Sequence, residues 1–506
     1  MMLCGLSACL FAIIGYVTSA KILAVIHAPT FSHYSLGVKL LRPLAEKGHH
    51  VTLVTHFSLE NPPKTWNEII LKDFTKGIAF GNKFDFLSMS NYKREMFANG
   101  IGVDLTERVL NHPAFVDLLN SNETFDLIIL ERFMNDALIG LSHRFKAPYI
   151  YLSPIGYSRW VSDLTGNPGS PAYYPDFFLG YSYDMTLWQR FYNTLFYCFA
   201  LVHRHMVVLP RHKELLKMHF PEAPSFEDLY YNSSLILMNT HFSIKYSVPS
   251  VPNMIDIGGY HVSPPRDLPN DLKKYMDSAT DGVIYFSLGS GAKSKDMPTE
   301  TRDAMLRVFS NLKQKVLWKW EEDVTFQKPS NVKMEKWFPQ QDVLAHPNLK
   351  LFITHGGLLS TIEAIYHAVP LLALPVFGDQ LMNAAEIEAL GYGLKLPFVD
   401  FDKQQFKLLI NEILTNNRYK KGIKTRSDIL HDQETKPVDR AVWWIEYVIR
   451  HKGAPHLKSV TLNLKWYQYI LLDVLALAVV IIFLIVTSVY VCLKKLFKEN
   501  KKSKKD

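Results

Sequence analysis

The segment from Trp337 to Gln380 determines the class of fold and ligand of this chain. Its three informative pieces are WFPQQDVLAHP (337–347), FITHGGLLSTIEAI (352–365) and PVFGDQ (375–380). Together they contain an aromatic side chain that can stack on a base, a strand that passes into a helix through two glycines, and side chains that bind hydroxyl groups. These are the parts needed to hold a nucleoside diphosphate bonded to a sugar.

The middle piece has the pattern of a phosphate-binding turn. Residues 351–354 form a short apolar run that is typical of a buried parallel strand, and residues 358–367 have helical spacing. Between them, His355-Gly356-Gly357 leaves free backbone N–H groups at the start of the helix. That end of a helix carries partial positive charge and accepts a phosphate well.

The remaining polar and aromatic residues suit the other parts of such a ligand. His355 can add a donor to a diphosphate. Glu363 lies about two helical turns further on, where a carboxylate can accept both ribose hydroxyls. Trp337 can stack on a flat base, and Asp379 and Gln380 can bind the hydroxyls of a hexose.

Taken singly, each of these features has an ordinary structural explanation. An HGG triplet after a strand is usually a tight turn, a tryptophan usually packs in a core or interface, and an Asp-Gln pair usually lies in a solvated loop. The ordered set at these spacings favours the nucleotide-sugar interpretation. The chain has no GxGxxG motif after a strand, which disfavours a nicotinamide or flavin dinucleotide.

Outward from this segment, strand and helix patterns alternate along most of the chain. In the first half they predict strands at 21–28, 50–55, 126–130 and 149–152, and helices at 32–47, 103–119 and 136–145. A second series starts with VIYFSLGS (283–290), and residues 437–450 have a helical pattern. The alternation predicts two parallel-sheet α/β domains, 21–263 and 282–450, joined by a polar linker at 264–281.

The segment resembles the signature of the UDP-glycosyltransferases, the membrane-bound family that includes the glucuronosyl- and glucosyltransferases of detoxification. SLGS (287–290), the region around His33 and an apolar C-terminal segment also match, so the resemblance covers nearly the whole chain. It implies two doubly wound Rossmann-like domains facing each other across a cleft (the GT-B type), followed by one C-terminal transmembrane helix. The first domain would bind the acceptor, the second the UDP-sugar, and residues 437–450 would return to the first.

The resemblance also implies the reaction and the donor-binding residues. A hexose would be transferred with inversion from a UDP-sugar, bound as a co-substrate and not as a cofactor, to a hydroxyl of a small lipophilic acceptor. The residues themselves do not call for a metal, because no DxD-type pair lies at the donor site and the helix N-terminus can neutralise the diphosphate. Trp337 would stack on uracil, Gln340 would bond near the ribose, Ser290, His355, Gly356 and Gly357 would bind the diphosphate, Glu363 the ribose hydroxyls, and Asp379 and Gln380 the sugar.

The chain departs from the family pattern after HGG. Many members have asparagine two residues further on, whereas this chain has Leu359, followed by Ser360 instead of glycine. One side-chain contact with the donor is therefore lost or replaced. Ser360 is the candidate replacement.

His33 is the candidate general base. It follows the first strand, at the edge of a doubly wound sheet where ligands bind, and histidine titrates close enough to neutrality (~6.5) to take a proton from an acceptor hydroxyl. A carboxylate should orient it. The family has an aspartate directly after the strand that begins with Phe-Asp. In this chain, FDLIILER (125–132) has Glu131 at that position. We favour Glu131 as the partner; Asp136 either replaces it or caps the next helix.

Both ends of the chain carry apolar segments of membrane type. Residues 3–17 have the length of a signal-peptide core, and a small-residue cleavage site follows, so residues 1–20 are predicted to be a signal peptide. An N-terminal anchor is the alternative. After a juxtamembrane segment (451–469), residues 470–492 are long enough to span a bilayer.

The tail, 493–506, predicts the orientation and the compartment. It contains seven lysines and two acidic residues, which supply most of the net charge of +8. The charge therefore fits a cytosolic anchor under the positive-inside rule and does not indicate nucleic-acid binding. Lys502 and Lys504 resemble a dilysine retrieval signal. We expect a single-pass type I protein of the endoplasmic reticulum membrane with lumenal catalytic domains, glycosylated at Asn122 and Asn232, in which Cys198 is the one lumenal cysteine.

The aromatic-rich run 181–199 has two interpretations that can coexist. It is either a packing helix or a wall of the acceptor site that also touches the membrane surface.

Three functions remain open at this stage. The leading one is a membrane-anchored UDP-glycosyltransferase for detoxification. UDP-glucose is the favoured donor, because the Leu359 variation and the overall signature look more like those of invertebrate-type members that use glucose. The second is a non-catalytic relative that binds UDP-sugars or acceptors, or partners an active transferase. The third is a transferase acting on membrane lipids or polysaccharides. The acceptor and the oligomeric state are not determined.

Overall fold

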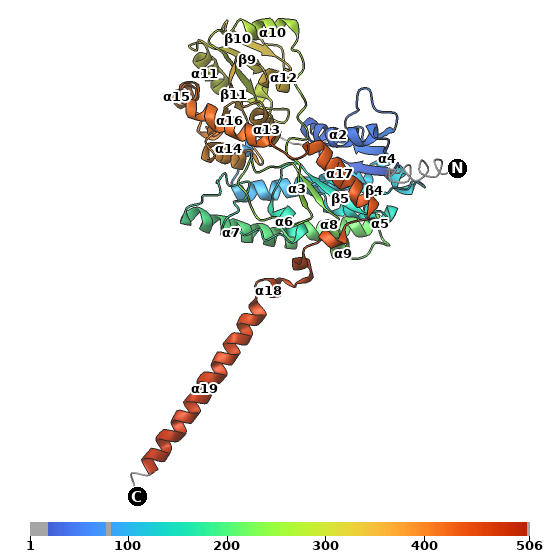
Figure 1. Cartoon of the computed structure of the whole chain (residues 1–506), viewed down its shortest axis with the longest axis vertical. Helices are drawn as coiled ribbons and strands as arrows, with labels where there is room; N and C mark the ends of the chain where they lie inside the picture. Colours follow the sequence, from blue (N-terminus) through green and yellow to red (C-terminus); the bar gives the residue numbers. More distant parts are fainter. Residues whose placement is uncertain (1–18, 77–81, 503–506) are drawn as a thin grey trace, which may run out of the picture.

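The computed structural model describes residues 19–76 and 82–502. Almost all of the predicted signal peptide, and Lys504 of the dilysine pattern, therefore lie outside the described residues. The chain forms two lobes, each built on a parallel sheet, and a long helix that leaves the first lobe (Figure 1).

The first lobe contains a seven-stranded sheet of order β3-β2-β1-β4-β5-β6-β7. Its strands are β1 Lys21–Val25, β2 His50–Thr55, β3 Trp66–Ile70, β4 Leu127–Glu131, β5 Tyr149–Ser153, β6 Ile236–Met238 and β7 Met254–Asp256. All neighbours pair in parallel. The strand order reverses between β1 and β4, and ligands bind beyond the carboxyl ends of strands at such a switch point.

The second lobe repeats this plan with six parallel strands in the order β10-β9-β8-β11-β12-β13. These are β8 Val283–Ser287, β9 Lys315–Lys319, β10 Val332–Glu335, β11 Leu349–Thr354, β12 Leu371–Ala373 and β13 Gly393–Lys395. Its switch point lies between β8 and β11. Ser290 and His355 follow these two strands, so the fold brings them to the same edge.

Helices cover both faces of each sheet. Those of the first lobe are α2 Phe31–Glu46, α3 Asn91–Asn111, α4 Pro113–Asn120, α5 Gly140–Phe145, α6 Arg159–Thr165, α7 Leu187–His203, α8 Leu209–His219 and α9 Phe226–Tyr230. Those that follow are α10 Asn270–Asp277, α11 Thr299–Phe309, α12 Gln340–Leu344, α13 Leu358–Tyr366, α14 Gln380–Ala389, α15 Lys403–Thr415, α16 Asn417–His431, α17 Pro437–Arg450, α18 Trp466–Tyr469 and α19 Leu472–Lys502.

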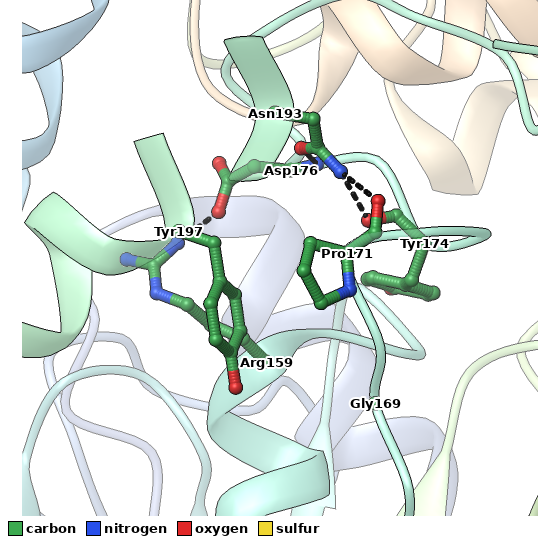
Figure 2. A pocket seen from close by; sticks show the side chains of 7 residues that line it. All are labelled: Arg159, Gly169, Pro171, Tyr174, Asp176, Asn193 and Tyr197. Carbon is green, nitrogen blue, oxygen red and sulfur yellow. Dashed lines mark hydrogen bonds and ion pairs between the residues drawn. The ribbon is translucent and has the colours of Figure 1, made fainter. Parts of the chain in front are cut away.

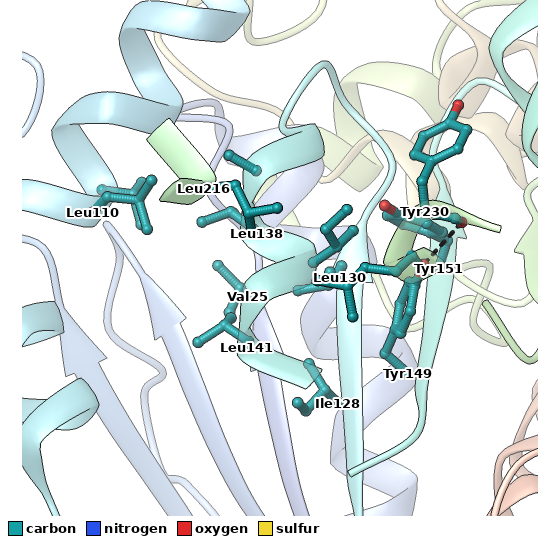
Figure 3. Packing of buried hydrophobic residues seen from close by; sticks show 14 of the residues in the cluster. Val25, Leu110, Ile128, Leu130, Leu138, Leu141, Tyr149, Tyr151, Leu216 and Tyr230 are labelled. Carbon is teal, nitrogen blue, oxygen red and sulfur yellow. Dashed lines mark hydrogen bonds between the residues drawn. The ribbon is translucent and has the colours of Figure 1, made fainter. Parts of the chain in front are cut away.

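Alternate residues of the first sheet enter two separate cores. Val25, Ile128 and Leu130 pack against helices on one face (Figure 3), whereas Ile22 and Ile129 pack with α2 and α17 on the other. Strands covered on both faces must be apolar throughout, and each fully buried aliphatic side chain contributes ~1.5–3 kcal/mol. This explains why the strands were recognisable as apolar runs.

Two segments pack in ways that the sequence pattern alone does not specify: α17 crosses to the first lobe, and residues 264–281 attach to the second. α17 returns to the first lobe and packs against α2, with Ala441, Val442 and Ile445 in the shared core. Residues 264–281, expected to be a linker, contain α10, whose Leu272 and Met276 are buried in the core of the second lobe.

Some predicted elements have different bounds. The helix expected at 103–119 begins earlier and is divided at Pro113, where α4 starts. Proline has no N–H and is therefore tolerated in the first turn of a helix but not in its interior. Residues 136–145 form a 3₁₀ turn (Asp136–Ile139) followed by α5.

The C-terminal helix α19 is longer than the predicted span of 470–492. Within residues 19–76 and 82–502, one helical segment, Leu472–Phe497, is long and apolar enough to cross a membrane, with a mean hydropathy of 3.0. Leu471 has a left-handed φ of 58°, which interrupts the helical conformation between α18 and α19.

Candidate active site

The fold brings His33 and Glu131 together at the switch point of the first sheet. His33 lies in the first turn of α2, and Glu131 is the last residue of β4. The two are 98 residues apart in sequence, and His33 Nδ1 is hydrogen-bonded to Glu131 Oε1. Because Nδ1 is engaged with the carboxylate, Nε2 is the ring nitrogen left to accept a proton.

Glu131 is buried and held by three groups. Its Oε2 accepts a hydrogen bond from Ala28 N–H at 3.1 Å and lies 3.4 Å from His27 Nδ1. Burial alone would raise the pKa of Glu131, but His33 and His27 outweigh it and hold the pKa well below its usual value. The carboxylate is therefore charged and can stabilise a cationic His33. His27, at the end of the first apolar run, was not identified from the sequence.

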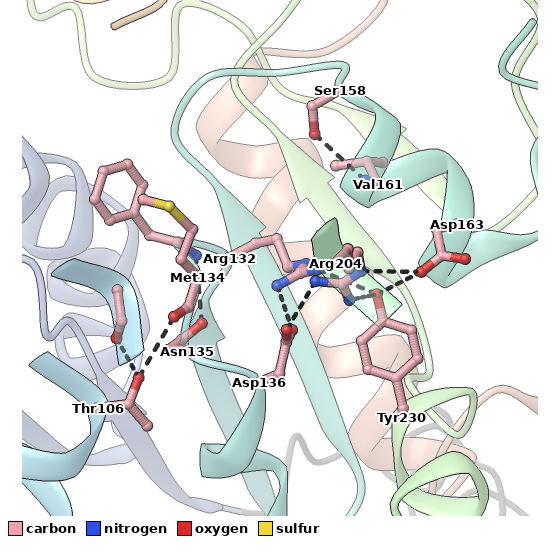
Figure 4. Close-up of polar contacts among 12 residues, drawn as sticks. Thr106, Arg132, Met134, Asn135, Asp136, Ser158, Val161, Asp163, Arg204 and Tyr230 are labelled. Atoms are coloured by element: carbon pink, nitrogen blue, oxygen red, sulfur yellow. Dashed lines mark hydrogen bonds and ion pairs between the residues drawn. The ribbon is translucent and has the colours of Figure 1, made fainter. Parts of the chain in front are cut away.

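Asp136 occupies a different environment. Its two oxygens accept hydrogen bonds from Arg132 Nη1 at 2.7 Å and Arg204 Nη1 at 3.0 Å, and both arginines also donate to the hydroxyl of Tyr230 (Figure 4). Although burial opposes ionisation, the arginines hold the pKa of Asp136 below its usual value. Of the two candidate carboxylates, the structure thus brings Glu131 to His33 and places Asp136 between two arginines.

His355 sits in a slot formed by glycines. A Cβ added at Gly289 would lie 2.6 Å from the ring, and one added at Gly357 would lie 2.4 Å from Nε2. Gly289 and Gly356 also have left-handed φ values of 78°. Burial, with a contribution from Lys319, lowers the pKa of His355 to about 4. The ring is therefore neutral at neutral pH, and the glycines of SLGS and HGG are required for it to fit.

Glu363 is bound by the two glutamines of the WFPQQ piece. Gln340 Nε2 donates to Glu363 Oε2 at 2.6 Å, and Gln341 Nε2 donates to Oε1 at 2.9 Å. Gln340 also donates to Ser360 Oγ at 3.0 Å. Burial raises the pKa of Glu363, and the two glutamines oppose this shift. Sequence reasoning found Gln340 and Ser360 but missed Gln341.

The substitution at Leu359 has a structural explanation. Its side chain packs against the core that the first sheet forms with α2 and α17, and so it contributes to contact between the lobes. Ser360, the next residue, points instead to the Gln340–Glu363 pair.

Asp379 and Gln380 begin α14, on the side of the second lobe that faces the first (Figure 1). Gln380 Oε1 accepts from the N–H groups of Val376 and Phe377 at 2.9 and 3.0 Å, which leaves its amide NH₂ to donate. Asp379 accepts from Asn383 at 2.8 Å. Burial raises the pKa of Asp379, and the charge of Lys245 is the main influence that opposes this shift.

Trp337 lies at the same junction. It is 57% exposed, and its ring makes an edge-to-face contact with Phe31 of α2 at 6.0 Å between centroids. Lys319 lies over the ring at 5.3 Å and donates to Gly289 O at 2.6 Å. Lys319, also missed from the sequence, adds positive charge beside the His355 slot. Among the described residues, 19–76 and 82–502, no group of three or more His, Cys, Asp or Glu side chains could hold a metal ion.

The family model for UDP-glucoronosyl and UDP-glucosyl transferase matches residues 64–505 of this chain. The chain belongs to this family. The UDP-glycosyltransferase resemblance predicted from the sequence is thereby confirmed, and transfer of a sugar from a UDP-sugar follows as the activity of the enzyme.

Relatives of this UDP-glycosyltransferase match over almost their full length. UDP-glycosyltransferase UGT5 of Dactylopius coccus is 36% identical, with 95% of this chain and 93% of the relative covered. UDP-glucosyltransferase 2 of the same species is 35% identical (91% and 90% covered), and human 2-hydroxyacylsphingosine 1-beta-galactosyltransferase is 29% identical (98% and 93% covered).

Solved structures confirm the expected fold class. A UDP-glucosyltransferase from Polygonum tinctorium has a TM-score of 0.59 at 16% identity, covering 85% of this chain and 98% of that one. The calicheamicin glycosyltransferase CalG4 has a TM-score of 0.57 at 16% identity, covering 86% and 99%. This UDP-glycosyltransferase therefore has the GT-B type of fold, with two Rossmann-like lobes.

Proposed function

We propose that this UDP-glycosyltransferase transfers a hexose, with inversion, to a hydroxyl group of a small lipophilic acceptor, and that His33 is the general base. The observation that carries the proposal is the buried His33–Glu131 pair in the first turn of α2, where Phe31 contacts Trp337 of the second lobe. The candidate base thus lies where the first lobe meets the donor-binding lobe. A base at this junction can activate an acceptor hydroxyl for attack on the anomeric carbon of a sugar held by the second lobe.

The proposed reaction uses Nε2 of His33 to remove the acceptor's proton. The hydroxyl oxygen forms the new bond to the anomeric carbon as the bond to the UDP oxygen breaks, and UDP leaves with the electron pair. Glu131 stabilises the imidazolium that forms. The N–H groups at the start of α13, together with Lys319, offset the charge that develops on the diphosphate.

Each donor contact is proposed from the geometry of the second lobe. Trp337 stacks on the uracil with its exposed face. Gln340, Ser360 and Glu363 form a connected polar group for the ribose. Ser290, His355, Gly356 and Gly357 bind the diphosphate, and Asp379 with the Gln380 amide binds the sugar.

UDP-glucose is the favoured donor. Two observations support it. With Leu359 after HGG, the donor signature looks more like that of invertebrate-type members, which use glucose, and a relative with 35% identity is named a UDP-glucosyltransferase. The role that fits a lipophilic acceptor and a glucosyl donor is conjugation in detoxification.

The proposed location is the membrane of the endoplasmic reticulum. α19 would be the single membrane span, with both lobes in the lumen and the lysine-rich tail in the cytosol. The apolar length of Leu472–Phe497 and the lysines gathered at the C-terminal end of the chain support this orientation.

One experiment tests the donor and the base together. Microsomes containing the wild type, His33→Ala or His50→Ala are incubated with UDP-glucose, UDP-glucuronate or UDP-galactose and a panel of phenols and lipophilic alcohols, and conjugates are detected by mass spectrometry. His50 is an exposed residue at the start of β2 and serves as the matched control. We expect glucosides from the wild type and His50→Ala and none from His33→Ala.

Two other results would contradict the proposal. Equal product from His33→Ala would exclude His33 as the base. No product from any donor, while UDP still protects the wild type against heat, would favour a non-catalytic UDP-binding relative.

A further inference from the structure

A series of hydrogen bonds joins the helix that carries His33 to Glu363 of the second lobe. Lys39, which follows His33 on α2, donates from Nζ to Ser263 Oγ at 2.7 Å. Ser263 N–H donates to Gln341 Oε1 at 3.0 Å, and Gln341 Nε2 donates to Glu363 Oε1 at 2.9 Å. A helix rises ~1.5 Å per residue, so Lys39 lies about 9 Å along α2 from His33. We call this series of contacts the interlobe bridge.

The middle of the interlobe bridge lies in the crossing segment, residues 257–266, which leads from β7 toward α10. This segment is attached on both sides. The hydroxyl of Tyr260 donates to Leu36 O of α2 at 3.2 Å, and Arg266 N–H donates to Asp342 Oδ1 of α12 at 2.7 Å. The serine of the bridge is therefore held in place relative to both helices.

The crossing segment determines which end of the Gln341 amide faces Glu363. A backbone N–H only donates, so Ser263 N–H requires the amide oxygen and turns the NH₂ group toward the carboxylate. His261, whose Nε2 lies 3.9 Å from Glu363 Oε1, is neutral here because burial lowers its pKa to about 4. The groups hydrogen-bonded to the carboxylate are thus the amides of Gln340 and Gln341. A carboxylate has about four lone-pair sites, so each oxygen can still accept a ribose hydroxyl.

We propose that the residues of the interlobe bridge, Lys39, Ser263 and Gln341, are positioning residues of the transferase. They hold the Glu363 carboxylate for the ribose of the donor and keep it at a fixed distance from the base on α2. This inference rests on the proposed roles of His33 and Glu363. Such alignment matters because a misplacement of ~1 Å can lower a rate ~10²-fold.

The lobes are also joined at the other end of the candidate site, near the start of α14. Figure 2 shows Asn193 of α7, which donates to the carbonyls of Pro171 and Tyr174 at 2.7 and 2.8 Å. The loop that it fixes continues to Gly180, where an added Cβ would lie 3.3 Å from Leu381 Cβ of α14. Breaking the interlobe bridge should therefore disturb the alignment of the lobes without separating them.

The binding of two nucleotides tests the role of Gln341. UDP and 2′,3′-dideoxy-UDP, which lacks both ribose hydroxyls, are titrated calorimetrically into the full-length wild type, Gln341→Met and Gln433→Met. Gln433 donates to Leu430 O at 2.7 Å and is the matched control. A hydrogen bond to a charged group contributes roughly 10- to 100-fold. We therefore expect Gln341→Met to raise the Kd for UDP about tenfold and to change that for dideoxy-UDP less than about twofold, with Gln433→Met like the wild type.

The wild type separates two kinds of failure in this binding test. Equal affinity of the wild type for UDP and dideoxy-UDP would overturn the ribose contact of Glu363, and the inference with it. A preference for UDP that Gln341→Met retains in full would overturn the inference alone. The same loss in Gln433→Met would also overturn it, because the effect would then be structural.

Steady-state kinetics test the connection to α2. Lys39→Met, Ser263→Ala and the double variant are assayed with UDP-glucose and the acceptor that the wild type conjugates fastest. Each single variant should lower kcat about tenfold. The double variant should lose no more, because both changes break one contact. Arg42→Met is the control, since Arg42 pairs with Glu46 of the same helix, and it should match the wild type.

Two kinetic results would overturn the connection to α2. One is an unchanged kcat in either single variant, and the other is a loss in the double variant equal to the product of the single losses. The Kd for UDP should stay within about twofold of wild type in Lys39→Met, because the contact of Gln341 with Glu363 remains.

Discussion

Replacing Glu131 by glutamine should remove the proposed base while leaving the site almost unchanged in shape. The glutamine oxygen can still accept the hydrogen bond from Ala28 N–H, which reaches Glu131 at 3.1 Å. Its NH₂ group then faces His33 Nδ1 and turns that nitrogen into an acceptor. The ring proton moves to Nε2, so Nε2 can no longer take a proton from the acceptor hydroxyl.

The size of the effect follows from the role that is lost. General-base catalysis contributes ~10²–10⁴-fold, which corresponds to about 2.7–5.4 kcal/mol at ~1.36 kcal/mol per factor of ten. We therefore expect kcat of Glu131→Gln to fall by ~10²–10⁴-fold. KM for the UDP-sugar should be unchanged, because the oxygens of Glu131 are turned toward His33, His27 and Ala28 and away from the donor-binding loops.

The assay measures initial rates of conjugate formation in microsomes, normalised to folded protein. Glu446→Gln is a matched control, since Glu446 is a second buried carboxylate beside a histidine, 3.5 Å from His49, on α17. A kcat for Glu131→Gln within about threefold of wild type, or less than ~0.7 kcal/mol, would refute the assignment. A loss of the same size in Glu446→Gln would show that the effect is structural.

Three further predictions concern the donor slot, the buried charges and the response to acid. Gly357→Ala places a methyl group 2.4 Å from the His355 ring and should raise KM for the UDP-sugar at least tenfold, or by ~1.4 kcal/mol; steady-state kinetics showing an unchanged KM would contradict the slot. Asp136→Asn leaves buried Arg132 without its anion and Arg204 with Asp163 alone, and should lower the stability by ~3–5 kcal/mol; thermal unfolding measures this, and unchanged stability would exclude the ion-pair cluster as a structural element. Burial lowers the pKa of His212 to about 4. Between pH ~6.5 and 4 the histidine is therefore protonated in the unfolded chain but not in the folded one, and the stability falls by up to about 3 kcal/mol per such histidine as the pH is lowered. His212→Gln should reduce this decline in acid unfolding curves, and an identical decline in the variant would contradict it.

The second lobe was predictable because its signals are local. The strand that leads into His355, the two glycines and the helix that carries Glu363 are consecutive in sequence, so their spacing alone predicts their relative placement. Gln341 and Lys319 were missed for the opposite reason. A glutamine beside a glutamine, and a lysine at the end of a strand, carry no distinctive spacing, and only packing shows that they reach Glu363 and Gly289.

Element bounds were least accurate where tertiary contacts override the local pattern. Residues 264–281 are polar and contain prolines, as a linker should, yet Leu272 and Met276 attach them to the second core. α3 begins before the range in which its apolar periodicity was recognised, and the partner helix after it begins at Pro113.

The sequence by itself determined the family, the fold class and an apolar C-terminal segment long enough to cross a membrane, because each depends on residues close together in the chain. Only the tertiary structure decided which carboxylate meets His33. Glu131 and Asp136 are five residues apart, and the position of Glu131 after its strand favoured it without excluding Asp136. The choice depends on Arg204, 68 residues beyond Asp136, and on His33, 98 residues before Glu131. Such long-range pairings are set by how the sheet and its helices pack, and so they become visible only in the folded chain.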